Sequence, residues 1–506
     1  MPSDFGDVSP DMDVIDRFLR CAATYRDHPA VVSEGTPTSY RDLLRRARAF
    51  AAAFSGRDEP RVLIGLPQVP DAYAAILGAG LAGGYHTPLN LSAPREKLRK
   101  IASVLDPDVI VASGDLGRDL HAQTPGAMLI DPLEIGDSEQ FEGDSRRHRI
   151  AYILFTSGST GIPKGVVVPR SALNHYVHWL ETFNIGPGDR VSQQPNLAFD
   201  ISMTDIFGAL CFGASLHPVL AEGDRLMPAR MIAREGITVW NSTPSVVNLM
   251  MQARQVTAAN LRSVRLFNFC GEPLLPDQLR ALFAARPDVA VQNTYGPTEA
   301  TISMTCQPLA VDTYVAASGA SVALGDPIPG MAIHLVGGAH ADEGEIVISG
   351  PQLAEGYWQD PEKSAQAFRP FAHGTRTLRG YFTGDWAERR AGFLFFKERM
   401  DFQVKVRGFR IELDEVAAAI RATGWPVACV FKRGEALAAV VERVPGLRFS
   451  ETALLQALAE RIESHAIPET VREIERMPRN DNDKLDRKAA ARWLDDVTAP
   501  ASRRPT

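Results

Sequence analysis

Tyr152-Ile-Leu-Phe-Thr-Ser-Gly-Ser-Thr-Gly-Ile-Pro-Lys-Gly-Val166 is the stretch around which the chain is organised. Its first four residues are apolar or aromatic and predict a buried strand. Hydroxyl residues then alternate with glycines before the stretch closes on Lys164 and Gly165. Such a loop suits a polyphosphate, because glycines let the backbone approach closely while N–H groups and hydroxyls donate to phosphoryl oxygens. It is not a Walker A loop, in which Ser or Thr follows the lysine.

The composition indicates a globular protein with an ordinary surface. At 506 residues the chain is long enough for two or more domains. The net charge of −7 argues against a nonspecific nucleic-acid binder, which needs a basic surface. Five scattered cysteines favour a reducing compartment over a disulfide framework or a metal site. The polar N-terminus and the lack of a long apolar run predict a cytoplasmic protein that does not use the membrane.

The order of predicted elements indicates an α/β fold. Strand and helix patterns alternate up to about residue 316, which predicts parallel sheets covered by helices; residues 12–58 are expected to be helical. Shorter strands follow and predict a β-rich subdomain. We expect a large N-terminal domain of residues 1–400, a small mobile α+β domain of residues 401–497 and a disordered tail of residues 498–506.

A second glycine pattern does not point to a nucleotide. Gly78-Ala-Gly-Leu-Ala-Gly83 matches GxGxxG formally, but it falls within or at the end of an Ala-rich predicted helix. A dinucleotide site needs these glycines between a strand and the start of a helix. Close helix packing is therefore the better interpretation.

Several further motifs occur in order along the chain. They are Asn196-Leu-Ala-Phe-Asp-Ile-Ser202, Phe269-Cys-Gly-Glu272, Asn293-Thr-Tyr-Gly-Pro-Thr-Glu299, Tyr381-Phe-Thr-Gly-Asp385 and Pro478-Arg-Asn-Asp-Asn-Asp-Lys-Leu-Asp-Arg487. Together with the first stretch, over about residues 15–490, they resemble the adenylate-forming enzymes. That superfamily includes acyl-CoA synthetases and the amino-acid adenylation domains of nonribosomal peptide and antibiotic biosynthesis. The finer resemblance is to free-standing adenylation enzymes and D-alanine–carrier-protein ligases.

The resemblance implies ATP as a substrate and Mg²⁺ as its metal ion. The implied ATP-binding residues are Thr156, Ser157, Gly158, Ser159, Thr160, Lys164, Gly271, Glu272, Asn293, Tyr295, Asp385 and Arg399. Thr298, Glu299 and Lys484 are the implied catalytic residues, and Glu299 is also the implied Mg²⁺ ligand. Asp401 occupies the position of the hinge. An aspartate, Asp483, stands where a glycine usually precedes the catalytic lysine.

Asp200 decides the class of substrate. By resemblance, this residue pairs with the α-ammonium group of an amino acid. The alternative is that Asp200 caps the helix that begins near Ser202, and an acid–CoA ligase would then fit. A carboxylate that faces an apolar pocket needs a cation, which an ammonium group supplies. This argument favours the amino acid.

The remaining pocket positions are mainly small or polar and favour a small or polar amino acid. They are Ile201, Thr204, Asn241, Asn268, Cys270, Thr294, Ile302 and Ser303. No carrier domain follows residue 490, so the expected partner is a separate carrier protein with a phosphopantetheine thiol. A non-catalytic nucleotide-binding relative is the third interpretation, and the intact Lys164, Glu299, Asp385 and Lys484 count against it.

Overall fold

The computed structural model describes residues 12–141, 149–156, 163–400, 403–479 and 485–498. It divides into two compact units. The first comprises Met1–Asn90, Ala102–Phe155 and Gly165–Met400, and the second Leu91–Ile101, Thr156–Lys164 and Asp401–Thr506. Each unit is described by itself below.

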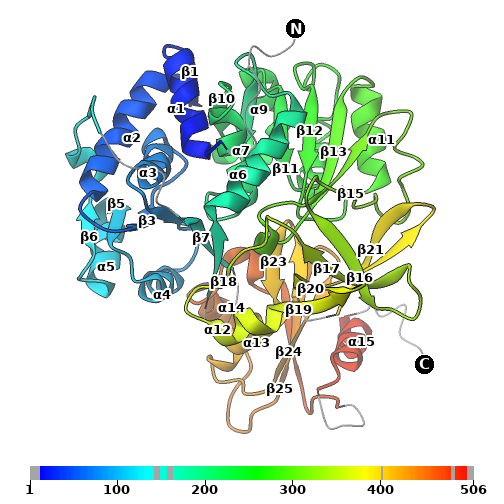
Figure 1. Ribbon diagram of the computed structural model, residues 1–506. Helices are drawn as coiled ribbons and strands as arrows, with labels where there is room; N and C mark the ends of the chain where they lie inside the picture. Colours follow the sequence, from blue (N-terminus) through cyan, green and yellow to red (C-terminus); the bar gives the residue numbers. More distant parts are fainter. Residues whose placement is uncertain (1–11, 142–148, 157–162, 401–402, 480–484, 499–506) are drawn as a thin grey trace. The chain divides into compact units, whose positions relative to one another are not determined.

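A mainly parallel sheet dominates the first unit (Figure 1). Within the described residues its nine strands run β15 (Asp326–Pro327), β14 (Thr305–Leu309), β13 (Ala290–Tyr295), β12 (Leu266–Phe269), β11 (Val239–Ser242), β9 (Arg190–Gln193), β10 (Ser215–Pro218), β1 (Pro29–Ser33) and β2 (Thr36–Ser39). The strands from β13 to β1 are parallel, β14 and β2 pair antiparallel with β13 and β1, and β15 pairs antiparallel with β14. This arrangement confirms the predicted α/β class.

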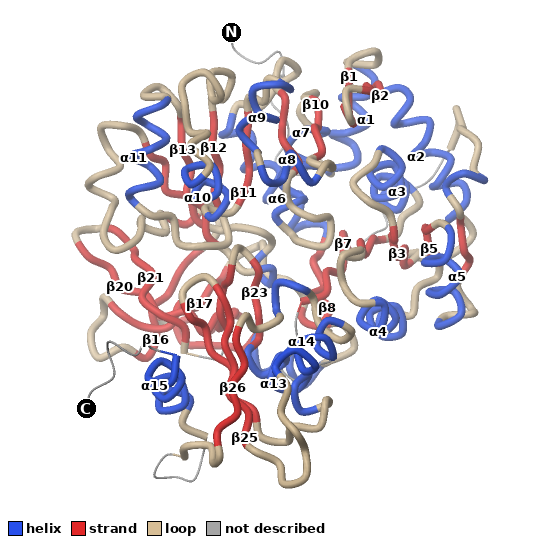
Figure 2. The backbone as a smooth tube through the Cα atoms, turned by 180° about the vertical axis from the view of Figure 1, so that it is seen from behind, coloured by secondary structure: helices blue, strands red, loops and turns tan. Residues whose placement is uncertain are grey.

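Two hydrophobic cores cover the two faces of this sheet. Along β12, Phe267 and Phe269 belong to one core, and Leu266 belongs to the other. Side chains alternate along a strand, so Asn268 shares the face of Leu266. Helix α11 (Pro276–Ala285) packs on the first face, beside β12 and β13 in Figure 2, whereas α6 (Arg170–Trp179) and α7 (Ile201–Leu210) contribute to the second core.

A second sheet has its own parallel centre. Over the described residues its seven strands run β18 (Gly356–Tyr357), β8 (Lys164–Pro169), β7 (Ile150–Thr156), β4 (Tyr85–Pro88), β3 (Arg61–Gly65), β5 (Val109–Ala112) and β6 (Met128–Ile130). The buried strand that the opening stretch predicts is β7, and the glycine- and hydroxyl-rich loop joins it to β8. A Cβ atom on Gly165 would lie 2.8 Å from Cγ2 of Ile153, so close strand packing requires glycine at the start of β8.

The predicted β-rich subdomain is antiparallel. It contains β16 (Ala332–Gly337), β17 (Glu343–Ser349), β19 (Phe368–His373), β20 (Arg376–Arg390) and β21 (Phe393–Arg399). β20 pairs with β17, β19 and β21. Asp385 and Arg399 are directly opposite each other in the β20–β21 ladder, which brings two of the implied ATP-binding residues together.

The helical prediction for residues 12–58 is correct only at its ends. Helices α1 (Val14–Thr24) and α2 (Tyr40–Phe54) flank the hairpin of β1 and β2. Glu34 and Gly35 both have positive φ, at 49° and 78°. When both central residues of a two-residue hairpin loop have positive φ, the turn matches the right-handed twist of the two strands. Val31 and Val32 add the β-branched character that strands favour.

The interpretation of Gly78 and Gly80 as packing residues is confirmed. Both lie in α3 (Pro70–Leu81), where a Cβ on Gly78 would stand 2.8 Å from Cβ of Phe50 on α2. A Cβ on Gly80 would stand 2.6 Å from Cδ1 of Ile15 on α1. Side chains at either position would force these helices apart.

The second unit is α+β. It pairs β22 (Gln403–Val406) with β23 (Phe409–Glu412), and β24 (Ala428–Arg433), β25 (Ala436–Glu442) and β26 (Thr470–Ile474) form another sheet. Helices α13 (Leu413–Arg421), α14 (Glu451–Ala459) and α15 (Arg487–Thr498) complete it.

The other helices of the chain are α4 (Arg95–Leu105), α5 (Gly114–Gln123), α8 (Glu222–Leu226), α9 (Pro228–Glu235), α10 (Ser245–Gln252) and α12 (Pro361–Ala367). Across the described chain, none of the helices has the length and apolar character needed to span a membrane.

Candidate active site

The carboxyl ends of β11, β12 and β13 bring polar side chains to one edge of the nine-stranded sheet. On the face turned toward α7, Val239 and Leu266 are apolar, and Asn241 and Asn268 follow them two residues later. Asn241 and Asn268 are register partners, and both are buried. Thr294 on β13 donates through Oγ1 to the carbonyl of Phe269 at 3.0 Å. Parallel sheets bind ligands at this edge.

The start of α7 supplies Asp200, whose backbone is already helical at φ −60° and ψ −32°. A capping residue normally has extended torsions, which let its side chain reach back to the first-turn N–H groups. Accordingly, the Asp200 side chain makes no capping hydrogen bond to the described first turn of α7. The carboxylate is close enough to Tyr152 and Tyr176 to contribute to the raised pKa of both phenols, although burial is the larger cause. Asp200 therefore lies near two buried phenols, and its side chain does not cap the described first turn of α7.

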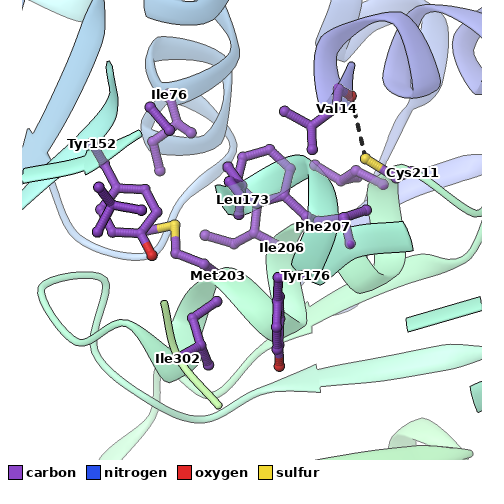
Figure 3. Close-up of a cluster of buried hydrophobic side chains, with 14 of the residues drawn as sticks. Val14, Ile76, Tyr152, Leu173, Tyr176, Met203, Ile206, Phe207, Cys211 and Ile302 are labelled. Carbon is purple, nitrogen blue, oxygen red and sulfur yellow. Dashed lines mark hydrogen bonds between the residues drawn. The ribbon is translucent and has the colours of Figure 1, made fainter. Parts of the chain in front are cut away.

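A short hydrogen-bond chain connects three elements on the pocket side of α7. The Tyr176 hydroxyl lies 2.8 Å from Oγ1 of Thr204, and Oγ of Ser303 donates to it at 3.4 Å. All three side chains are buried. Tyr176 thereby holds two of the predicted pocket residues in place. Figure 3 shows Tyr176 in the same cluster as Ile302, Met203 and Tyr152.

The turn after β13 is strained at Thr301 and Ile302. Both residues have positive φ, at 56° and 71°, which β-branched side chains rarely adopt. Oγ1 of Thr301 donates to the carbonyl of Gln352 at 2.7 Å and helps to hold the turn. Cys270 contacts the Ile302 carbonyl with an Sγ–O distance of 4.0 Å. Strain of this kind concentrates at functional sites.

Asp385 is the centre of a second polar cluster. Its Oδ2 accepts a hydrogen bond from the Tyr295 hydroxyl at 2.6 Å, and its Oδ1 accepts one from Arg399 at 2.6 Å. Arg399 also donates to the carbonyl of Thr383 at 3.0 Å. Burial, reinforced by the Asp385 charge, keeps the pKa of Tyr295 well above its usual value. The phenol therefore stays a donor and, with the guanidinium, orients a buried carboxylate.

Glu299 is fully buried in the short helix η4 (Thr298–Ala300). The Tyr357 hydroxyl donates to Oε1 of Glu299 at 2.9 Å. The backbone carbonyl of Glu299 accepts a hydrogen bond from the N–H of Ala354, also at 2.9 Å. Among the described residues there is no cluster of three or more metal-ligating side chains. A single carboxylate still fits Mg²⁺, which proteins commonly hold through one or two carboxylates while phosphates and water complete its shell.

The turn after β12 caps the N-terminus of the neighbouring helix α10. Gly271 has φ 95°, which only glycine adopts without strain. Glu272 then accepts a hydrogen bond at 2.8 Å from the backbone N–H of Ser245, the first residue of α10. A carboxylate at a helix N-terminus is favourable. Asn293 donates to the Ala323 carbonyl at 2.7 Å, so its amide is also committed to the protein.

Part of the predicted site lies outside the described residues. These positions are Ser157, Gly158, Ser159, Thr160, Asp401, Asp483 and Lys484. Thr156 ends β7 and Lys164 begins β8, so the structure describes both ends of the stretch predicted to bind phosphate.

Four residues to which the sequence analysis assigned no role support the predicted site residues. Tyr176 orders Thr204 and Ser303, Tyr357 holds Glu299, Thr383 contacts Arg399, and Asp205 bonds to Asn241. Thr383 lies within a motif and could have been noticed. The others are far from their partners in the sequence, and only the fold brings them together.

A family model described as AMP-binding enzyme matches residues 18–358. The chain belongs to the AMP-binding enzyme family. The match confirms the resemblance that the motifs indicated. The predicted enzyme class, a ligase, is confirmed by the names of curated relatives.

Two curated relatives within this family are both named D-alanine–D-alanyl carrier protein ligase. The protein from Listeria monocytogenes serovar 1/2a is 31% identical and covers 80% of this chain and 82% of its own length. The Bacillus cytotoxicus protein is 29% identical and covers 96% of this chain and 100% of its own length. Among solved structures, the adenylation domain AlmE of Vibrio cholerae, in complex with glycyl-adenosine-5'-phosphate, matches with a TM-score of 0.82 at 27% identity. That match covers 97% of this chain and 99% of AlmE, so the architecture of the AMP-binding enzymes extends over nearly all of the sequence.

Proposed function

We propose that this AMP-binding enzyme activates a small amino acid with ATP and then transfers the aminoacyl group to the thiol of a separate carrier protein. The proposal rests on the position of the Asp200 carboxylate. It lies beside two buried phenols, and it makes no capping bond to the described first turn of α7. A negative charge in such surroundings favours a cationic ligand. The α-ammonium group of an amino acid meets this requirement, and a simple carboxylic acid does not.

The size of the substrate follows from the side chains that are predicted to line the pocket. Thr204, Asn241, Asn268 and Ser303 are short and polar, and the Tyr176 hydroxyl ties two of them together. A long acyl chain would have to bury apolar surface against these groups and leave them unpaired. Glycine and alanine need no such space. The carrier-ligase names of the curated relatives and the glycyl-adenylate bound to AlmE support the same class of substrate.

The nucleoside of ATP is assigned to the Asp385 cluster. In this proposal Asp385, oriented by Tyr295 and Arg399, accepts hydrogen bonds from the ribose hydroxyls, and the Tyr295 ring stacks on adenine. Gly271, Glu272 and Asn293 border the base. The loop from Thr156 to Lys164 cradles the outer phosphates, because its glycines and hydroxyls suit phosphoryl oxygens.

The first step is attack by a substrate carboxylate oxygen on the α-phosphorus, which breaks the bond to the bridging oxygen and releases pyrophosphate. Two anions must approach each other, so charge neutralisation and in-line orientation provide most of the catalysis. We assign Thr298 to the α-phosphate and Lys484 to both the carboxylate and ATP. Glu299, fixed by Tyr357, would hold Mg²⁺, which neutralises phosphate charge when bound.

The second step is attack by a thiolate on the activated carbonyl carbon, with AMP as the leaving group. A carrier-protein thiol is the proposed acceptor, since the curated relatives are named as carrier protein ligases. Asp401 is the proposed hinge that would let the second unit take different positions in the two steps. Cytoplasmic localisation is part of this proposal, because none of the five cysteines forms a disulfide in the described chain, as a reducing compartment favours.

Pyrophosphate exchange over a panel of amino acids and their des-amino analogues tests the proposal. Exchange that depends on a small amino acid, followed by loading of a carrier protein but not of CoA, is the expected result. Exchange only with acids that lack an amino group would favour the acid–CoA ligase. If no acid supports exchange, the chain is not a working adenylating enzyme.

A further inference from the structure

A second carboxyl group lies on α7, five residues after Asp200. Asp205 is in the middle of α7, a helix whose residues from Ser202 to Leu210 are all buried. Its side chain accepts a hydrogen bond at 2.6 Å from Nδ2 of Asn241 on β11. Asp205 is 0% exposed and Asn241 1% exposed, so water does not solvate either group.

The remaining oxygen of each group has no conventional partner. Oδ2 of Asp205 and Oδ1 of Asn241 are both buried, and neither has a hydrogen-bond partner among the described residues. Both atoms accept hydrogen bonds when Asp205 is ionised, so they cannot bond to each other in that state. Leaving two buried acceptors unpaired costs free energy. One proton on Oδ2 of Asp205 would turn this atom into a donor. A hydrogen bond from it to Oδ1 of Asn241 would then pair both atoms.

The surroundings favour that proton. Burial raises the pKa of Asp205 well above its usual value, and only the Asn241 hydrogen bond opposes the shift. No lysine or arginine within the described chain contributes a compensating charge. The nearby Tyr73 on α3 is itself buried with a raised pKa, and its hydroxyl donates to Gln193. An isolated ionised carboxylate would be costly at this place.

We propose that Asp205 is a neutral carboxylic acid and a positioning residue: it donates from Oδ2 to Asn241 Oδ1 while accepting from Asn241 Nδ2, and so fixes the amide at the pocket wall. The resulting ring of two hydrogen bonds joins α7 to β11. The ring pairs both polar atoms of the Asn241 amide with Asp205. It also holds the carboxyl end of β11 in place beside Asn268 on β12.

This inference rests on the proposed function, because Asn241 matters for specificity only if the pocket receives an amino acid. The two carboxyl groups of α7 then have separate roles. Asp200 carries the negative charge that attracts the ammonium, and Asp205 supplies shape without charge. The pocket can thus present a single negative charge although two aspartates lie within five residues.

Infrared spectroscopy of the wild-type protein tests the protonation state without any reference to catalysis. We expect a C=O stretching band of a protonated carboxyl that persists from about pH 5 to about pH 9, a range in which ordinary aspartates are ionised. The band should disappear in Asp205→Asn. Absence of a band specific to Asp205 overturns the proposal, even if amino-acid activation is intact.

Two substitutions test the positioning role through the Michaelis constants for amino acid and ATP. Asn at position 205 can replace the acid donor with an amide N–H, so Asp205→Asn should keep the amino-acid KM within about threefold. Asp205→Leu has a similar size but leaves the Asn241 amide unpaired, and should raise the amino-acid KM by about tenfold or more while the ATP KM stays nearly constant. If Asp205 were ionised, Asp205→Asn would instead remove a pocket charge and weaken amino-acid binding strongly.

The double variant Asp205→Leu, Asn241→Leu separates folding from specificity. Replacement of both partners by apolar groups can be nearly neutral for stability. We therefore expect it to melt close to the wild-type temperature yet to have lost its discrimination among small amino acids. Wild-type discrimination in the folded double variant would show that the pair has only a structural role and would refute the proposal.

Discussion

Replacing Asp200 with asparagine removes one negative charge from the start of α7 and keeps nearly the same side-chain shape. If the carboxylate binds the substrate ammonium, the variant leaves that cation without its counter-charge. Loss of one partner from a buried charge pair costs about 2–5 kcal/mol. Asp200 is partly exposed, so the lower end applies, and about 2 kcal/mol corresponds to roughly a thirtyfold loss of kcat/KM for the amino acid.

Stability should hardly change in the same variant. Asparagine is as good a capping residue as aspartate, and the Asp200 side chain makes no capping bond to the described first turn of α7. We expect the free energy of unfolding to shift by less than about 0.5 kcal/mol. The melting temperature therefore serves as the folding control for the kinetic measurement.

The assay is pyrophosphate exchange with the best amino acid and, in parallel, with its des-amino analogue. A folded Asp200→Asn protein should lose activity toward the amino acid and gain relative preference for the analogue. Unchanged amino-acid kinetics in a folded variant would refute the ammonium assignment and favour the acid–CoA ligase.

Three further predictions concern the two chemical steps. Lys484→Ala should reduce adenylation by about a hundredfold or more while thioester formation from preformed aminoacyl-adenylate continues, because one charge-stabilising donor is lost in the first step only; equal losses in single-turnover assays of both steps would contradict this assignment. Asp401→Pro locks φ near −65° and should preserve pyrophosphate exchange but block carrier loading; a variant that keeps both activities argues against a hinge here. Tyr357→Phe deletes the donor to Glu299, a bond to a charged group worth about 1.5–3 kcal/mol, and should raise the Mg²⁺ concentration for half-maximal exchange by about tenfold; an unaltered Mg²⁺ titration would separate Glu299 from the metal.

Local patterns in the sequence were sufficient for the fold class. The buried strand before the predicted phosphate loop, the alternation of strands and helices and the shorter strands after residue 316 all follow from periodicity and composition. The antiparallel pairing of those shorter strands was seen only in the structure. Gly78 and Gly80 were recognised as packing residues because their place in a helix excludes a nucleotide loop. The hairpin of β1 and β2 was missed because its strands are short and lie between two helices.

The site was predictable where a residue belongs to a motif and hidden where it acts through a neighbour. Asp200 and Asp385 stand in recognisable stretches. Tyr176 and Tyr357 instead reach Ser303 and Glu299 across 127 and 58 positions of the chain. Such pairings depend on how sheets and helices are stacked, and no local pattern encodes them.

The left-handed turn at Thr301 and Ile302 constrains how this pocket can change its substrate. Each such residue costs of order 1–3 kcal/mol, which the surrounding contacts must offset. Substitution of Ile302 therefore alters the backbone energy as well as the cavity, and glycine or asparagine there would relax the turn. Thr204 lies on a regular helix, where a new side chain changes the pocket surface and the hydrogen bond to Tyr176 but not the backbone energy. Redesign of the amino-acid preference should accordingly begin with substitutions on α7 and leave Thr301 and Ile302 unchanged. In natural divergence of such pockets, we likewise expect α7 positions to change before the turn does.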